Sequence, residues 1–296
     1  DTADCGADMG IKFNLSYEAD PEIGRLFRTT DFRRALALGI DRDQINETFW
    51  LGTGTPGSVV PRETNKYNPG PEYRTRWATY DLKQANEMLD KLGLSQKDAE
   101  GYRQRTDGKG RLSLVVTTWG GQFVQFTQIA EMIREQYKKI GIDLQVQEIE
   151  RSLGQRRNAG NETQIWAWQN DGSDHLYTFP NHVFPYLGVD GSPHYAEWFQ
   201  TNGEQGKEPP DWLKDVMQKF KRAFGVPEAE QVKLGKEIWA TMADNIMTIG
   251  VVGLGAATLG VRIAKNNVGN QPSRQYNSPD GKTPAASRTM TFYFKS

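Results

Sequence analysis

Residues 31–61 constrain the fold more than any other segment, because they predict two consecutive helices and the way the chain leaves them. Apolar residues recur at helical spacing in two successive stretches. We expect Asp31 to cap the first helix and Asp41 to cap the second, with Gln44 in the position of a capping box. A turn rich in glycine and proline follows, and the chain leaves it extended as far as Pro61. These patterns predict two capped helices that dock on a sheet.

The same segment resembles the signature of the family 5 extracellular solute-binding proteins, R-x-A-l-x-x-a-I-D-R-x-x-I followed by G-x-g-x-P and a later proline. The matching residues are Arg33 or Arg34, Ala35, Leu36, Ile40, Asp41, Arg42, Ile45, Gly52, Gly54, Pro56 and Pro61. This family contains the peptide- and nickel-type receptors that feed bacterial ABC importers. The resemblance therefore implies an α/β fold: a periplasmic-binding-protein-like (type II) lobe with a mixed, mostly parallel sheet flanked by helices.

The resemblance extends from about Ile11 to about Pro272, and family members carry a whole N-terminal lobe before this region. We therefore expect the chain to be the C-terminal lobe of a longer exported receptor. Residues 1–263 would form the ligand-binding lobe, and residues 264–296 would return toward the other lobe. The resemblance also implies a periplasmic or extracellular protein, associated with the membrane through the permease or through a lipid anchor in the full-length protein.

The middle of the chain predicts a strand–helix–strand unit. Apolar residues alternate through residues 111–118 and again from Ile142, and a helical stripe from Phe126 to Ile140 separates them. Such a crossover places the two strands parallel. Ligands collect at the carboxyl ends of parallel strands. This rule selects the residues just after the first strand, and the candidate contacts there are Trp119, Gly120 and Gly121.

Three other elements follow from local patterns. We expect Asp81 to cap a helix with Gln84 in the capping-box position. Asp211 should cap a later helix with a broad apolar face, and a further helix should follow it. Residues 246–252 are rich in β-branched residues and predict a buried strand.

A third strand, residues 164–168, ends in the sequence WAWQNDGSDHLYTF. Trp166 and Trp168 alternate along it, so both indoles should point to one face. Their flat faces suit a peptide side chain or a sugar ring, and the alternative is that they fill the core. In the resembled family this strand enters a W-x-x-D-x-x-D-P loop, where an acidic residue can receive the amino terminus of a peptide. Asp171 and Asp174 keep that spacing, which leaves open which of them faces the ligand.

Other classes of function receive little support. A formal net charge of −1 gives no electrostatic reason to expect a nucleic acid partner. The chain lacks the phosphate-binding, serine-hydrolase and zinc-protease motifs. His175, His182 and His194 match no ligand spacing, so we expect surface or packing histidines, no metal and no cofactor.

Two hypotheses follow. The favoured one is a non-catalytic receptor that captures a small solute between two lobes and delivers it to an ABC permease. The solute would be an oligopeptide or, as the alternative, an oligosaccharide. The candidate ligand contacts are Trp119, Gly120, Gly121, Trp166, Trp168, Asp171 and Asp174. The less favoured hypothesis is a hydrolase that uses Asp171 and Asp174 as its carboxylate pair.

Overall fold

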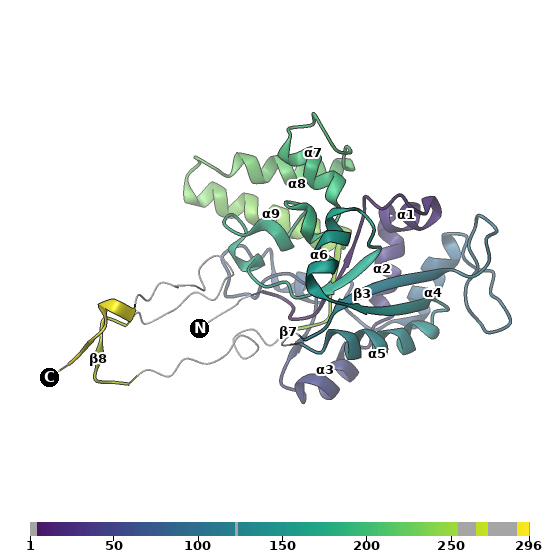
Figure 1. Ribbon diagram of the computed structural model, residues 1–296, viewed down its shortest axis with the longest axis horizontal. Helices are drawn as coiled ribbons and strands as arrows, with labels where there is room; N and C mark the ends of the chain where they lie inside the picture. Colours follow the sequence, from purple (N-terminus) through teal and green to yellow (C-terminus); the bar gives the residue numbers. More distant parts are fainter. Residues whose placement is uncertain (1–4, 122–123, 254–264, 272–288, 296) are drawn as a thin grey trace.

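A mixed sheet forms the centre of the computed structural model, which describes residues 5–121, 124–253, 265–271 and 289–295. Within these residues the sheet has five strands in the order β4-β3-β5-β1-β6 (Figure 1). The strands are β1 (Gly10–Phe13), β3 (Ser113–Trp119), β4 (Asp143–Ile149), β5 (Ile165–Trp168) and β6 (Thr248–Gly250). β3 is parallel to β4 and β5, whereas β1 is antiparallel to β5 and β6. The α/β class and its mixed sheet are therefore confirmed.

The predicted strand–helix–strand unit is present as β3, α5 (Phe126–Lys138) and β4. β3 and β4 pair in parallel along their whole lengths, with Ser113 opposite Asp143. The helix packs on both strands through buried apolar residues at helical spacing, including Ile129 and Ile133. The periodicity of the sequence is thus sufficient to specify this part of the fold.

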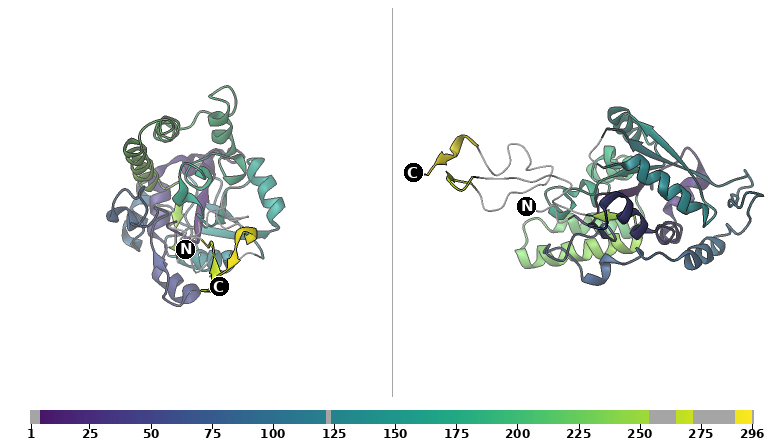
Figure 2. Two further views of the ribbon diagram at one scale, coloured as in Figure 1. Left: turned by 90° about the vertical axis from the view of Figure 1, so that its left-hand side faces the viewer. Right: turned by 90° about the horizontal axis from the view of Figure 1, so that it is seen from below.

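Helices surround the sheet, and α8 and α9 lie side by side as a pair (Figures 1 and 2). The helices are α1 (Pro21–Arg28), α2 (Thr30–Leu38), α3 (Arg42–Trp50), α4 (Leu82–Lys91), α6 (Arg151–Ala159), α7 (Pro193–Gln200), α8 (Asp211–Arg222) and α9 (Glu228–Asn245). Short 3-10 turns include η1 (Pro71–Arg74), η2 (Ser173–His175), η3 (Pro180–His182), η4 (Gly188–Asp190) and η7 (Thr289–Thr291).

Two short strand pairs lie outside the central sheet: β2 (Thr55–Pro56) with β7 (Val252–Gly253), and β8 (Val268–Gly269) with β9 (Tyr293–Phe294). The strand predicted over 246–252 is thus divided between β6 and β7. Of the predicted return segment 264–296, the described parts contain β8, η7 and β9, which lie to one side of the main body (Figure 2). The remainder of that segment lies outside the described residues.

Two of the predicted helix caps are confirmed. The carboxylates of Asp41 and Asp81 accept hydrogen bonds from the backbone N–H groups of Gln44 and Gln84, at 3.0 and 2.9 Å. In α3 the reciprocal bond of the capping box comes from another helix. Gln136 of α5 accepts from the Asp41 N–H at 3.0 Å and donates to the Gln44 side chain at 2.9 Å. The cap therefore also ties α3 to α5.

The prediction that Asp31 caps a helix is wrong. α1 ends at Arg28, and α2 begins almost at once at Thr30, with Thr29 at its N-cap. Asp31 is already inside the first turn, where its carboxylate pairs with Arg34 at 2.9 Å. The helical signal from Asp31 onward was correct, but the unpredicted helix before it moved the start of α2.

The prediction that Asp211 caps α8 is also wrong, because this helix too begins earlier than predicted. The N-cap is Pro210, which is held extended at φ −61° and ψ 155°, and Asp211 is the first helical residue. Its carboxylate pairs with Lys214 at 2.9 Å. Proline fixes the φ angle at the boundary and so sets where the helix begins.

Two buried arginines of the segment 31–61 anchor the end of α9 and the end of β6. The Arg33 guanidinium donates to the carbonyl oxygens of Asn245 and Ile246, at 2.6 and 2.8 Å. The Arg42 guanidinium donates to the Gly250 carbonyl at 2.9 Å. Burial lowers the pKa of Arg33 to about 9 and that of Arg42 to about 10. Arg33, rather than Arg34, is therefore the signature arginine that lies fully buried and binds backbone carbonyl groups in the interior.

We expect Arg33→Met to lower the free energy of unfolding by about 3 kcal/mol, because several buried carbonyl groups lose their donor. Urea denaturation measures the change. Arg134→Met is the matched control, since Arg134 lies on the solvent side of α5 and pairs with Glu131. The control should leave stability nearly unchanged. Equal effects of the two substitutions would contradict the anchoring role of Arg33.

Candidate ligand-binding site

The predicted site segments lie together at one end of the central sheet, at the edge formed by the carboxyl ends of β3 and β5. β3 and β5 are parallel, and their register places Trp119 beside Trp168, with ring centroids 4.8 Å apart. In the antiparallel pairs, Gly10 lies opposite both Trp168 and Gly250. The loop with Asp171 leaves β5 at this edge. The sequence rule that selected the carboxyl ends of the parallel strands therefore selected segments that are neighbours in space.

Trp119, Trp166 and Trp168 form one contact group, which we call the tryptophan cluster. Trp166 and Trp168 share a face of β5 as predicted, with ring planes 16° apart and centroids separated by 6.4 Å. Trp119 lies 5.0 Å from Trp166, and Phe126 stacks on Trp168 at 5.4 Å. The three indoles are 3%, 1% and 6% exposed. In this conformation the three indoles pack like core residues. Whether a ligand can reach them therefore depends on the residues that cover them.

The cover over the tryptophan cluster is α6 and the chain around η4, which pack on each other. At Gly154 of α6 an added Cβ would lie 2.0 Å from the Trp119 Nε1 atom. At Gly191 it would lie 3.1 Å from the Trp166 Nε1 atom. The exposed side chain of Arg151 lies over Trp168, with its guanidinium carbon 4.9 Å from the ring centroid. One helix and one loop of the described chain therefore pack directly on the indoles.

A buried polar group adjoins the tryptophan cluster. Lys12 of β1 lies opposite Trp166, and its Nζ atom is 5.3 Å from the centre of that indole. The same Nζ atom is 2.9 Å from His182 Nδ1, and His182 Nε2 is 3.5 Å from Asp171 Oδ1. We call these three residues the Lys12–His182–Asp171 chain. Asn170 also accepts from Lys12, at 3.4 Å. All four side chains are buried.

The predicted aspartates both lie in this buried region. Asp171 is 7% exposed and Asp174 is 5% exposed, and Asp174 Oδ2 is 3.4 Å from His175 Nε2. The sequence did not identify Lys12 as a partner of this loop. The available signal was a lysine between two large apolar residues, Ile11 and Phe13, in the segment where the family resemblance begins.

The predicted glycines have a structural explanation. Gly121 has a φ of +71°, which glycine adopts without strain. At Gly120 an added Cβ would lie 2.6 Å from the Glu148 carboxylate. Gly121 therefore lets the chain turn after β3, next to Trp119, and Gly120 leaves room for the Glu148 side chain.

Burial lowers the pKa of Lys12 to about 8, and the charges of Asp190 and then Asp171 oppose this shift. Burial also raises the pKa of the Cys5 thiol, and Asp8, Asp174 and Asp171 add to the effect. Lys12 is therefore still charged at neutral pH, whereas the thiol is protonated. This leaves a lysine charge in the interior beside the candidate contacts.

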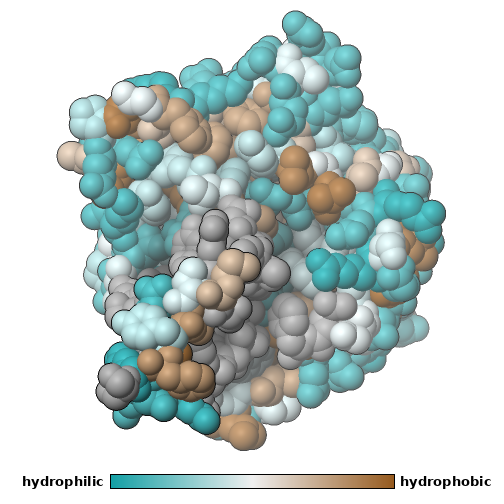
Figure 3. Space-filling model, turned by 60° about the vertical axis from the view of Figure 1, so that its left-hand side comes forward, coloured by the Kyte–Doolittle hydropathy of each residue, from teal (hydrophilic) through white to brown (hydrophobic). Residues whose placement is uncertain are grey.

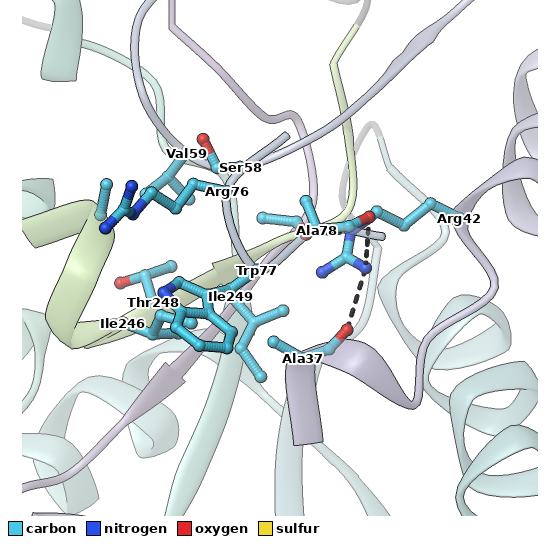
Figure 4. A pocket seen from close by; sticks show the side chains of 12 residues that line it. Ala37, Arg42, Ser58, Val59, Arg76, Trp77, Ala78, Ile246, Thr248 and Ile249 are labelled. Carbon is cyan, nitrogen blue, oxygen red and sulfur yellow. Dashed lines mark hydrogen bonds between the residues drawn. The ribbon is translucent and has the colours of Figure 1, made fainter. Parts of the chain in front are cut away.

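A separate hollow, between the segment 76–78 and the end of α9, was not predicted (Figure 4). Its lining includes Arg76, Trp77, Ile246 and Ile249, and its empty volume is about 250 Å³, including open solvent. None of the seven predicted contacts lines this hollow. We therefore place the candidate site at the tryptophan cluster.

The described surface offers little sign of other kinds of site. No set of three or more metal-ligating side chains occurs among the described residues. In the same residues, no helix is long and apolar enough to cross a membrane. On the side that comes forward in Figure 3, hydrophobic residues are scattered among hydrophilic ones.

The buried Lys12 makes stability depend on pH. The pKa of its amine is lower in the folded state than the ordinary value of 10.5, so unfolding takes up a proton between pH 8 and 10.5. Stability should therefore rise with pH across this window, and Lys12 should cost about 3 kcal/mol below pH 8. Denaturant titrations at pH 7 and pH 10 should show a larger gain in the wild type than in Lys12→Met. Identical pH profiles would exclude a buried charged Lys12.

A family profile and curated relatives match the chain. Residues 8–186 match the profile described as "Bacterial extracellular solute-binding proteins, family 5 Middle". A periplasmic alpha-galactoside-binding protein of Rhizobium meliloti is 24% identical over 260 residues, which cover 83% of this chain and 36% of that protein. The oligopeptide-binding protein AppA of Bacillus subtilis is 29% identical over 164 residues, covering 54% of this chain and 28% of AppA.

Solved structures show the same fold. An oligopeptide-binding protein OppA superposes with a TM-score of 0.77 at 24% identity, over 99% of this chain and 48% of that one. MelB of Agrobacterium fabrum C58, in complex with stachyose, has a TM-score of 0.66 at 17% identity, over 84% of this chain and 38% of MelB. This chain thus spans about half of these relatives or less. The profile covers more than half of the chain, which therefore belongs to the family 5 bacterial extracellular solute-binding proteins.

Proposed function

We propose that this chain is one lobe of the substrate-binding component of an ABC importer, which captures a solute, first of all an oligopeptide, and delivers it to a membrane permease. The observation that carries the proposal is the tryptophan cluster beside the Asp171 loop, at the sheet edge where a ligand is expected. The proposed contacts are Trp119, Gly120, Gly121, Trp166, Trp168, Asp171 and Asp174.

Two parts of the chain that are distant in sequence, residues 8–9 and 251–252, are hydrogen-bonded to each other at the same end of the sheet as the candidate site. The Asp8 N–H donates to the Val252 carbonyl at 2.8 Å, and the Val251 N–H donates to the Met9 carbonyl at 3.0 Å. Paired connections of this kind suit a hinge between two lobes. We propose that residues 1–263 form the ligand-binding lobe and that residues 264–296 return toward the other lobe. A ligand that contacts both lobes only when they are closed would then drive closure.

An oligopeptide would use the acidic loop and the sheet edge together. Asp171 or Asp174 would accept a hydrogen bond from an N–H or amino group of the peptide, and backbone groups would pair along a strand edge. The fold similarity includes AppA of Bacillus subtilis in complex with a nonapeptide, with a TM-score of 0.65. Binding of this kind requires no bond to be broken, so the proposal includes no catalytic residue and no cofactor.

An oligosaccharide is the second candidate, and the tryptophan cluster favours it. Stacked indoles can receive the apolar face of a sugar ring. The Nε1 atoms of Trp119 and Trp166 and the side-chain amide of Gln169 are buried, and they have no hydrogen-bond partner within the described residues. Such neutral groups can form hydrogen bonds with the hydroxyl groups of a sugar. A relative and a structural neighbour are named for an alpha-galactoside and for stachyose.

The cellular setting follows from the same proposal. The protein would act in the periplasm or outside the cell, near the membrane through its permease or a lipid anchor of the full-length protein. Its partners would be a small solute and that permease, and no nucleic acid. A hydrolase that uses Asp171 and Asp174 remains the less favoured alternative.

Thermal shift with trialanine and with stachyose tests the proposal. At saturation, we expect one of these probes to raise the melting temperature of the chain by about 2–4 °C, without any product by mass spectrometry. Asp171→Asn should reduce the shift. Release of alanine or of a monosaccharide, abolished by Asp171→Asn, would instead establish the hydrolase.

The lobe proposal predicts that the chain binds more weakly than a longer protein that also carries the N-terminal lobe. We expect at least about a tenfold difference in Kd, because half of the contacts are absent. Isothermal titration of both proteins with the same probe measures it. Equal affinities would contradict a site shared between two lobes.

A further inference from the structure

We propose that Lys12 is a specificity-determining residue, which through His182 places a positive charge behind Asp171 and so selects a neutral hydrogen-bond donor, rather than an ammonium group, at this end of the ligand. This inference rests on the proposed function, in which Asp171 is a ligand contact. The chemistry that fits is a peptide amide or a sugar hydroxyl.

The geometry fixes the direction of the hydrogen bond between Lys12 and His182 and, with it, the tautomer of the imidazole that faces Asp171. A charged lysine can only donate, so the contact of 2.9 Å makes His182 Nδ1 the acceptor. The imidazole then carries its proton on Nε2, which faces Asp171 Oδ1 at 3.5 Å. The arrangement directs the charge of Lys12 toward the carboxylate that the ligand is proposed to meet.

Lys12 cannot easily move away from this position. Its side chain is 3% exposed, its Nζ atom lies against the Trp166 ring, and Asn170 accepts a further bond from it. The ionisable groups that act on Lys12 come from separate elements: Asp190 from η4, Asp171 from the loop after β5, and Cys5 from the start of the described chain. The position of the lysine is therefore a fixed property of the site.

The consequence for a ligand follows from like-charge repulsion in a poorly solvated interior. An ammonium group near Asp171 would be attracted by that carboxylate and repelled by Lys12, so much of its advantage would be cancelled. A neutral donor would form the same hydrogen bond without the repulsion. The site therefore discriminates by the charge of the donor and not by its ability to donate.

The experiment uses two probes whose terminal nitrogens differ in charge: trialanine, and N-acetyl-trialanine, whose terminal nitrogen is a neutral amide. Because the acetyl group also adds bulk and an acceptor, the change in the ratio of their Kd values between wild type and variant is the measured quantity. NMR titrations of the chain at pH 7 give the ratio of their Kd values. We expect the wild type to bind N-acetyl-trialanine at least as tightly, and Lys12→Met to move the ratio about tenfold toward trialanine. Lys66→Met is the matched control, because Lys66 also lies over an aromatic ring but is exposed and pairs with Glu228.

An unchanged ratio in Lys12→Met, or the same change in Lys66→Met, would overturn the proposal. A second measurement needs no ligand: NMR titration of the Lys12 side chain in the wild type and in Asp171→Asn. The lysine should lose its proton at lower pH in the variant, and the His182 spectrum should show the proton on Nε2. Absence of both effects would overturn the coupling. If neither peptide binds, the oligopeptide function fails, and the titration alone decides the role of Lys12.

Discussion

Buried guanidinium groups that hold backbone carbonyl oxygens are the interaction on which the rest of this structure depends. Arg33 and Arg42 bind the ends of α9 and β6, and Arg74 donates to the carbonyl oxygens of Gly6 and Ser58, both at 2.7 Å. These carbonyl groups lie where the regular hydrogen bonding of helices and strands stops. Left unpaired in the interior, each would cost free energy. An arginine offers five donors and can satisfy several of them at once.

The arginines also determine where the candidate site can lie. Arg42 and Arg74 bind carbonyl groups near the sheet edge at which β3 and β5 end, whereas Arg33 binds the chain at the opposite end of β6. The tryptophan cluster and the Asp171 loop are built on the first of these edges. A contact surface placed on strand ends is held more rigidly than one placed on a free loop. The cost of burying charge in the anchoring arginines is therefore repaid as a defined geometry for residues that are far from them in the sequence.

Much of the fold was predictable because its signals are local. Asp41 and Asp81 cap helices as expected, and the alternation of Trp166 and Trp168 correctly placed both indoles on one face. The caps at Asp31 and Asp211 failed because a preceding helix or proline moved the boundary. The contact between Lys12 and His182 could not be found in this way, since the two residues are 170 positions apart and neither belongs to a motif. A pattern reveals the face of a strand, and only the assembled sheet reveals which charges meet.

The burial of the tryptophan cluster suggests how a site of this kind can bind without reacting. Lys12, His182 and Asp171 already contact one another in the interior, so in the proposed function a ligand adds a hydrogen bond at Asp171 and needs no new ion pair. Moving Arg151 and α6 away from the indoles would cost free energy, so in the proposed function the net binding free energy must come from contacts with the ligand, including contacts beyond this lobe. Affinity would then depend on closure and not on any single ion pair. In the proposed function, such a site would accept solutes of different shape that present neutral donors and a flat apolar face.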